Sequence, residues 1–204
     1  MSFINKLKTK VQTLAESTYS VRQEISIPIY ERNFNGIVDA EDIGKKCLAI
    51  RDSKAFDTSI NHFLSGAWKS PYYKRGESDE KFEEFSDLIN AVEDTLNALP
   101  AYNKAKTRFE ILEWWIIIYN KGAAIDWHDH IPVADAFTRF SATYYPLVPD
   151  NAQPLLIQNK DEVLTIPVTQ NKIVYFPSMT RHSVAECVSD EPRIMVGFNF
   201  EGLR

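Results

Sequence analysis

Residues 111–119 read Ile-Leu-Glu-Trp-Trp-Ile-Ile-Ile-Tyr, a short apolar run rich in β-branched and aromatic residues that is typical of a buried strand. Seven further β-rich runs follow, at about 124–130, 138–147, 154–158, 163–168, 172–176, 182–188 and 192–200. Turn residues separate these runs. Eight short strands spaced in this way predict a double-stranded β-helix, or jelly roll, whose two sheets close around a mouth.

The chain before this region has a mainly helical pattern with one added strand. Apolar residues recur at helical spacing near 3–14, from Asp39 to about Ile50, and from Ser78 to Leu96, whereas residues 24–30 alternate like an edge strand. No Pro/Gly-rich linker divides the chain. We therefore expect one domain over 1–204, mainly β with helices (α+β). A helical part, 1–105, packs outside a jelly-roll core, 106–204.

Composition excludes several classes of protein. The 204 residues are 44% hydrophobic and carry a formal net charge of −5, which supports a sizeable core and gives no basic footprint for nucleic acid. No apolar run approaches the ~20 residues of a membrane helix, and the first residues lack a signal-peptide pattern. Cys47 and Cys187 are too few for a disulfide framework. These features predict a cytoplasmic protein, and a homodimer stays open.

Three of the four histidines fall in two short β-rich segments. In a regular strand Asp126, His128 and His130 share one face, and His182 would approach from another strand. Three imidazoles can hold one metal ion, and non-haem iron oxygenases use comparable sites, usually with two His and a carboxylate. The fourth histidine, His62, has no such company and is expected to be structural.

Arg193 precedes the apolar run Ile194–Phe198. Arginines in such strands often end at the surface, but an inward arginine would need an anion to offset the cost of burial. The planar guanidinium suits a carboxylate held by two hydrogen bonds. A dicarboxylic acid that chelates the metal at one end would place its other carboxylate here.

These segments resemble a known family. Phe176–Val184, an acidic gap and then Arg193–Phe200 are similar to the C-terminal signature of Fe(II)/2-oxoglutarate-dependent oxygenases. The most similar branch consists of oxygenases common in phages and marine bacteria, distantly related to prolyl hydroxylases. Residues 119–130 and Ser141–Tyr145 resemble further motifs of that branch, and Ser65–Ser70 and Ile25–Tyr30 do so more weakly. The resemblance covers about residues 24–204.

The resemblance implies roles for the histidines. His128 would be the first metal ligand and His182 the distal one. The second ligand is usually Asp or Glu in the wider superfamily, but this branch commonly has His at that position, which is His130 here. Asp126 and Asp129 are the alternatives for the second ligand, or would accept a hydrogen bond from a ligating imidazole.

The resemblance also implies a co-substrate site. Arg193 would bind the distal carboxylate of 2-oxoglutarate, with Tyr145, Tyr119 and Ser141 beside it. Tyr144 points to the opposite face from Tyr145 and is expected in the core. Many relatives have Ser two residues after the arginine, and the methionine found there, Met195, removes a hydroxyl partner of the carboxylate.

The implied function is an Fe(II)- and 2-oxoglutarate-dependent dioxygenase. Such an enzyme would hydroxylate a C–H bond of a protein side chain or small molecule and release succinate and CO₂. A cupin-like metal-dependent enzyme and a non-catalytic jelly-roll protein are the alternatives. The loop Ser70–Glu77 carries aromatic and basic groups that could face the mouth, although a solvated connector is the simpler interpretation.

Overall fold

The computed structural model describes residues 20–21, 28–53, 64–99, 108–130 and 138–203. The predicted helix near 3–14, most of the predicted strand 24–30, and His62 lie outside these residues. The helices are α2 (Ala40–Asp52), α3 (Asp79–Glu84) and α4 (Ser86–Asn97). The strands are β1 (Ser20–Val21), β2 (Tyr30–Asn33), β3 (Leu64–Ser65), β4 (Trp68–Lys69), β5 (Tyr73–Lys74), β6 (Arg108–Tyr119), β7 (Ala124–His128), β8 (Thr138–Leu147), β9 (Leu155–Asn159), β10 (Glu162–Ile166), β11 (Lys172–Pro177), β12 (His182–Val184) and β13 (Arg193–Leu203).

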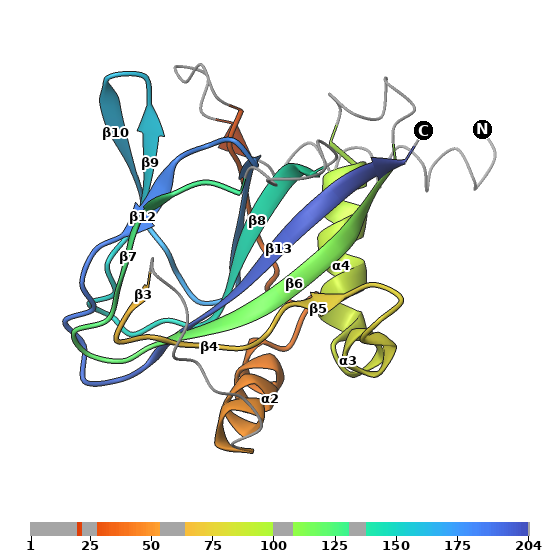
Figure 1. The fold of residues 1–204 in the computed structure, drawn as a ribbon, viewed down its shortest axis with the longest axis horizontal. Coiled ribbons are helices and arrows are strands. Elements are labelled where there is room, and N and C mark those ends of the chain that lie inside the picture. Colours follow the sequence, from red (N-terminus) through yellow and green to blue (C-terminus); the bar gives the residue numbers. More distant parts are fainter. Residues whose placement is uncertain (1–19, 22–27, 54–63, 100–107, 131–137, 204) are drawn as a thin grey trace.

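Two antiparallel sheets form the jelly roll, and the predicted fold class is confirmed (Figure 1). The larger sheet has the order β1-β2-β11-β8-β13-β6-β4, with β5 also paired to β6. The smaller sheet has the order β10-β9-β12-β7-β3. Helices α2 and α4 cover the face of the larger sheet that is turned away from the smaller one (Figure 1). The larger sheet is therefore buried on both faces.

Strand β6 shows how the sequence produces this double burial. Trp114, Ile116 and Ile118 point toward the helices, whereas Trp115, Ile117 and Tyr119 point into the space between the sheets. Successive side chains alternate faces in a strand, so a continuous apolar run is what a strand covered on both sides requires. The same alternation in β13 sends Ile194 and Val196 toward the helices and Met195 between the sheets.

Several predicted boundaries differ from the structure. The region before residue 106 contributes five short strands where one was expected, and its clearest strand begins at Tyr30, near the end of the predicted segment. The predicted helix from Ser78 to Leu96 breaks into α3 and α4 at Phe85. The Phe85 backbone leaves helical geometry (φ −107°, ψ 20°) while its ring packs 4.7 Å from the Trp114 ring. Tertiary packing thus overrides the helical periodicity at this position.

Among the residues that the structure describes, no helix is both long and apolar enough to cross a bilayer.

Candidate metal centre

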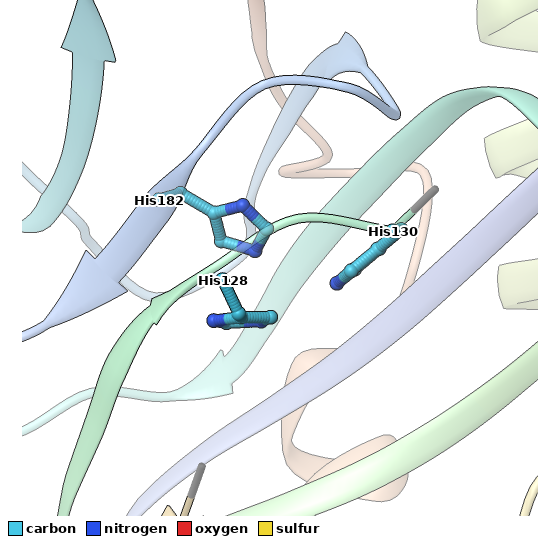
Figure 2. Close-up of side chains that lie close together, drawn as sticks. All are labelled: His128, His130 and His182. Carbon is cyan, nitrogen blue, oxygen red and sulfur yellow. The ribbon is translucent and has the colours of Figure 1, made fainter. Parts of the chain in front are cut away.

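His128 and His182 lie opposite each other on neighbouring strands of the smaller sheet. The register of β7 and β12 pairs the two residues directly, and their ring centroids are 4.2 Å apart. His130 follows β7 and brings its ring to within 4.9 Å of the His182 ring. Figure 2 shows the three rings turned toward one another. One nitrogen from each ring lies within 4.8 Å of the others, so these residues form a candidate metal site.

Hydrogen bonds fix which ring nitrogen His128 and His182 present. Nδ1 of His128 lies 2.8 Å from the carbonyl oxygen of Asp126, and Nδ1 of His182 lies 2.9 Å from that of Thr180. A carbonyl oxygen can only accept, so each Nδ1 carries the proton. Nε2 is therefore the unprotonated nitrogen of each ring, and an unprotonated ring nitrogen can bind a metal.

His130 presents the same nitrogen through a different set of partners. Its Nδ1 lies 2.9 Å from both Ser141 Oγ and Asn199 Oδ1. The orientation of the Asn199 amide is set from behind, because its Nδ2 donates to Glu113 Oε1 at 2.9 Å. Asn199 Oδ1 therefore accepts from His130, which again leaves Nε2 for the metal.

Desolvation favours the neutral form of the three imidazoles, which is the form that binds metals; His182 is buried, and His128 and His130 are half-buried. Desolvation, together with the charge of neighbouring histidines, lowers the pKa of His130 to about 3 and that of His182 well below its ordinary value. Desolvation also lowers the pKa of His128, although the backbone of Asp126 and the charge of Asp129 oppose the shift. At neutral pH a metal ion would not have to displace protons from these rings.

Neither backup carboxylate belongs to this cluster. The side chains of Asp126 and Asp129 are exposed, and the group of possible ligands found among the described residues consists of the three histidines. Asp126 does contact His128, but through its backbone carbonyl and not through its carboxylate. Strand β7 ends at His128, two residues earlier than predicted, so strand alternation does not determine where His130 points.

Arg193 lies inside the protein with part of its guanidinium unpaired. The side chain is 1% exposed, and its Nη1 donates to the carbonyl of Gln153 at 2.6 Å. Its Nε and Nη2 have no hydrogen-bond partner among the described residues. These two nitrogens form one edge of the guanidinium and suit a carboxylate bound through both oxygens. Because buried donors without partners are costly, the unpaired edge fits an anionic ligand.

Two tyrosines enclose this guanidinium. The centre of the Arg193 guanidinium lies 4.9 Å from the Tyr145 ring and 5.2 Å from the Tyr119 ring. Tyr145 also shares a 2.9 Å hydrogen bond with Thr143. The Tyr119 hydroxyl lies 3.9 Å from the sulfur of Met195. Tyr144 points to the opposite face, toward the helices.

Ser141 lies away from Arg193. It shares a face of β8 with Tyr145, but four strand residues span about 13 Å, too far for both to bind one carboxylate. Its hydroxyl instead contacts His130, Asn199 and Ser178. Ser141 thus lies behind His130 in the structure, and its expected role in the co-substrate site stays a prediction.

The residues that join the two ends of the site alternate along β13. Arg193, Met195, Gly197 and Asn199 all face the space between the sheets. A Cβ on Gly197 would lie 2.5 Å from Cε2 of Trp115, so this position requires glycine for the close approach of the indole. The Trp115 ring in turn lies 5.3 Å from the His130 ring. The position of the Trp115 indole next to His130 thus depends on the absence of a side chain at Gly197.

We expect Asn199→Leu to weaken Fe(II) binding by about 10- to 100-fold, because outer partners of metal-bound histidines contribute on this scale. The substitution removes the acceptor that orients His130 and leaves the donor Nδ1 with Ser141 alone. Competition with a coloured chelator would measure the affinity. Ser141→Ala retains Asn199 as the acceptor and should change the affinity much less. Equal losses in both variants would contradict the orienting role of Asn199.

The metal-free protein is expected to lose stability when the pH falls below about 6.5, the ordinary pKa of histidine. Above this pH the histidines are neutral in both the folded and the unfolded chain. Below it the unfolded chain binds protons that the folded chain excludes from His130 and His182, so unfolding becomes easier. At pH 5.5, protonation of these two residues in the unfolded chain should lower the free energy of unfolding by about 3 kcal/mol relative to neutral pH.

Urea unfolding at pH 7.5 and at pH 5.5 would test this expectation. The double variant His130→Gln/His182→Gln provides the control, since it should lose most of the pH dependence whatever its absolute stability. Desolvation raises the pKa of Glu93, so this residue makes the protein more stable as the pH falls, opposite to the histidines. Glu93 is present in both proteins and therefore does not affect the comparison. The same pH dependence in the double variant would exclude the histidines as its source.

Comparison with known proteins shows similarity in structure. No protein-family model and no curated protein sequence matches the chain. Among solved structures, a prolyl-4-hydroxylase from Pseudomonas putida is 14% identical with a TM-score of 0.64, over 86% of this chain and 93% of that one. A prolyl hydroxylase from Trichoplax adhaerens, in complex with a hypoxia inducible factor peptide fragment, is 15% identical with a TM-score of 0.63, over 85% and 83%.

A third similar structure is that of a biosynthetic enzyme. SnoN, a non-haem, α-ketoglutarate-dependent epimerase of nogalamycin biosynthesis, is 12% identical with a TM-score of 0.64, over 84% of this chain and 76% of that one. Structural similarity at sequence identities this low establishes a shared fold and nothing more. The jelly roll predicted from the strand pattern is therefore the fold of these proteins as well.

Proposed function

We propose that the protein is an Fe(II)- and 2-oxoglutarate-dependent oxygenase of the hydroxylase type. Bound iron would activate O₂, and 2-oxoglutarate would supply two electrons and leave as succinate and CO₂ while a substrate C–H bond gains a hydroxyl group. The fold shared with prolyl hydroxylases and with an α-ketoglutarate-dependent epimerase supports this proposal.

The observation that carries the proposal is the pairing of two features in one interior. The three imidazoles offer Nε2 atoms to a metal, and Arg193 offers an unpaired two-nitrogen edge from the larger sheet. A metal cluster alone would equally suit a cupin-like enzyme. A buried arginine with a free edge needs a second, anionic ligand, and a dicarboxylic acid that also chelates the metal satisfies both features.

Each side chain then has a definite task. His128, His130 and His182 would hold the iron, and Arg193 would bind the distal carboxylate of 2-oxoglutarate between the rings of Tyr119 and Tyr145. Burial of Arg193, Tyr119 and Tyr145 excludes water from the guanidinium, which strengthens its ion pair with the carboxylate. Met195 offers no hydroxyl to that carboxylate, so Arg193 and the tyrosines would contribute most of the polar recognition.

The substrate proposed is a peptide side chain or a small molecule. One structural neighbour is a prolyl hydroxylase bound to a peptide fragment, and others are enzymes of nogalamycin biosynthesis. Both substrate classes are thus used on this fold.

An anaerobic titration of metal-free protein with Fe(II) and then 2-oxoglutarate tests the function. Formation of the visible charge-transfer band of chelated 2-oxoglutarate, followed by release of succinate on admission of O₂, is the expected result. Tight Fe(II) binding without that band would favour a cupin-like metal enzyme. Failure to bind any divalent metal would exclude both enzymes and leave a non-catalytic jelly-roll protein.

A further inference from the structure

Lys69 extends the site at the edge of the larger sheet. It lies on β4, and the register of β4 with β6 places it opposite Ile117. Residues directly opposite each other in a sheet share a face, and Ile117 faces the space between the sheets. The strand pairing therefore directs Lys69 to the same side as the metal cluster.

Aromatic rings surround the ammonium group of Lys69. Its Nζ lies 3.7 Å from the centre of the Tyr72 ring and 5.5 Å from that of Trp115. The centroids of these two rings are 5.1 Å apart in an edge-to-face arrangement, and the Trp115 ring centroid lies 5.3 Å from that of His130. The positive charge of Lys69 contributes to the lowered pKa of both His128 and His130, which places it within electrostatic reach of the metal cluster.

This ammonium group has rings beside it but no anion in contact. Among the residues that the structure describes, it makes no hydrogen bond and no ion pair within 4 Å. Burial lowers the pKa of Lys69 to about 8, and the more distant charge of Glu113 opposes that shift only in part. Cation–π contacts leave all three N–H donors unused. A half-buried cation gains most from an anion in direct contact, and none of the described residues supplies one to Lys69.

We propose that Lys69, Tyr72 and Trp115 form a substrate subsite that binds a carboxylate, so that the enzyme acts on an acidic substrate. This inference rests on the proposed function and specifies the substrate class for the same site. Lys69 supplies the hydrogen-bonding cation, while the two rings cover the carbon atoms next to the carboxylate.

The geometry assigns this anion to the substrate and not to the co-substrate. Along β6, Tyr119 faces Arg193, whereas Trp115 contacts Lys69 four residues away, about 13 Å along the strand. Arg193 is fully buried, but Tyr72 is 47% exposed. The arginine end is thus closed, as suits a deeply held co-substrate, and the lysine end opens to solvent, where a substrate would enter.

Matched acid and amide probes can test the subsite without knowledge of the natural substrate. The acid probes are the N-acetyl, α-methylamide derivatives of aspartate and glutamate, and the neutral probes are those of asparagine and glutamine. Saturation-transfer NMR would compare their binding to Zn(II)-loaded protein with 2-oxoglutarate present. We expect one acid of the two pairs to bind at least about tenfold more tightly than its amide, as for a hydrogen bond to a charged group.

Three variants assign the effect to Lys69. Lys69→Met should abolish the preference for the acid, and Lys69→Arg should retain part of it. Lys45→Met is the matched control, because Lys45 is exposed on α2, which packs against the other face of the larger sheet. An equal loss in Lys45→Met would indicate a general charge effect and overturn the proposal.

Other outcomes separate this inference from the proposed function. A protein that forms the Fe(II)–2-oxoglutarate band but binds acid and amide equally, or binds no acid at millimolar concentration, overturns the subsite alone. A loss of 2-oxoglutarate affinity in Lys69→Met, with acid binding unchanged, also overturns it by assigning Lys69 to the co-substrate. A Lys69-dependent preference without metal or 2-oxoglutarate binding would overturn the proposed function and leave an anion site.

Discussion

Replacing Arg193 with Met is expected to weaken 2-oxoglutarate binding by at least about 100-fold, because it removes two hydrogen bonds between charged groups worth roughly 1.5–3 kcal/mol each. Fe(II) affinity should remain, since the three histidines lie on or just after β7 and on β12, whereas Arg193 lies on β13 of the other sheet. The anaerobic titration of the charge-transfer band against 2-oxoglutarate concentration measures the effect.

The stability of the same variant provides a second readout. In the absence of co-substrate, Arg193 keeps two buried donors unpaired, and Met fills a similar volume without them. Arg193→Met should therefore unfold at the same or a higher urea concentration than wild type, despite loss of the bond to Gln153. Arg193→Lys keeps the charge but not the planar two-nitrogen edge, so its affinity should be intermediate. Unchanged 2-oxoglutarate affinity in Arg193→Met would contradict the assignment.

The strand pattern of the core could be predicted because the relevant physics is local. Alternation and apolar runs placed all eight strands after residue 106, and β6 and β13 in particular combine β-branched residues with burial on both faces. The same alternation separated Tyr145 from Tyr144. These features follow from the two-residue period of a strand and need no knowledge of tertiary structure.

Other features depend on contacts between distant segments, and the sequence did not predict them. His130 lies beyond the end of β7, where its position is set by Asn199 and Ser141 from the larger sheet. Asn199 was missed although a signal exists, since it is a polar residue in the apolar run Phe198–Phe200 and is in phase with Arg193. The break between α3 and α4 at Phe85 depends on packing against Trp114, which is 29 residues away in the sequence.

The charge of the site links the co-substrate to the proposed substrate. Three neutral imidazoles add no negative charge to an iron dication, in contrast to a site with two histidines and a carboxylate. Arg193 and Lys69 place two more positive charges around it. A centre of this kind favours anionic ligands, so 2-oxoglutarate and an acidic substrate would both reduce the electrostatic cost of holding the metal.

Replacing His182 with Ala is expected to reduce Fe(II) affinity by more than about 100-fold, since loss of even an outer partner of a metal ligand costs 10- to 100-fold. His182 is the most buried of the three candidate ligands. It is 4% exposed, its Nδ1 is held by the carbonyl of Thr180, and its ring packs 4.7 Å from that of Phe176. Among the described residues, no fourth histidine and no carboxylate belongs to the cluster and could replace it.

Ser183→Ala provides the matched control for this substitution. Ser183 is the next residue of β12 and is also buried, but its side chain points to the opposite face of the strand. Its loss should leave Fe(II) affinity unchanged, so that a general disturbance of β12 can be separated from loss of the ligand. Chelator competition should show the two variants far apart, with the 2-oxoglutarate band absent from His182→Ala. Similar affinities in both variants would mean that His182 does not bind the metal, and the three-histidine site would have to be abandoned.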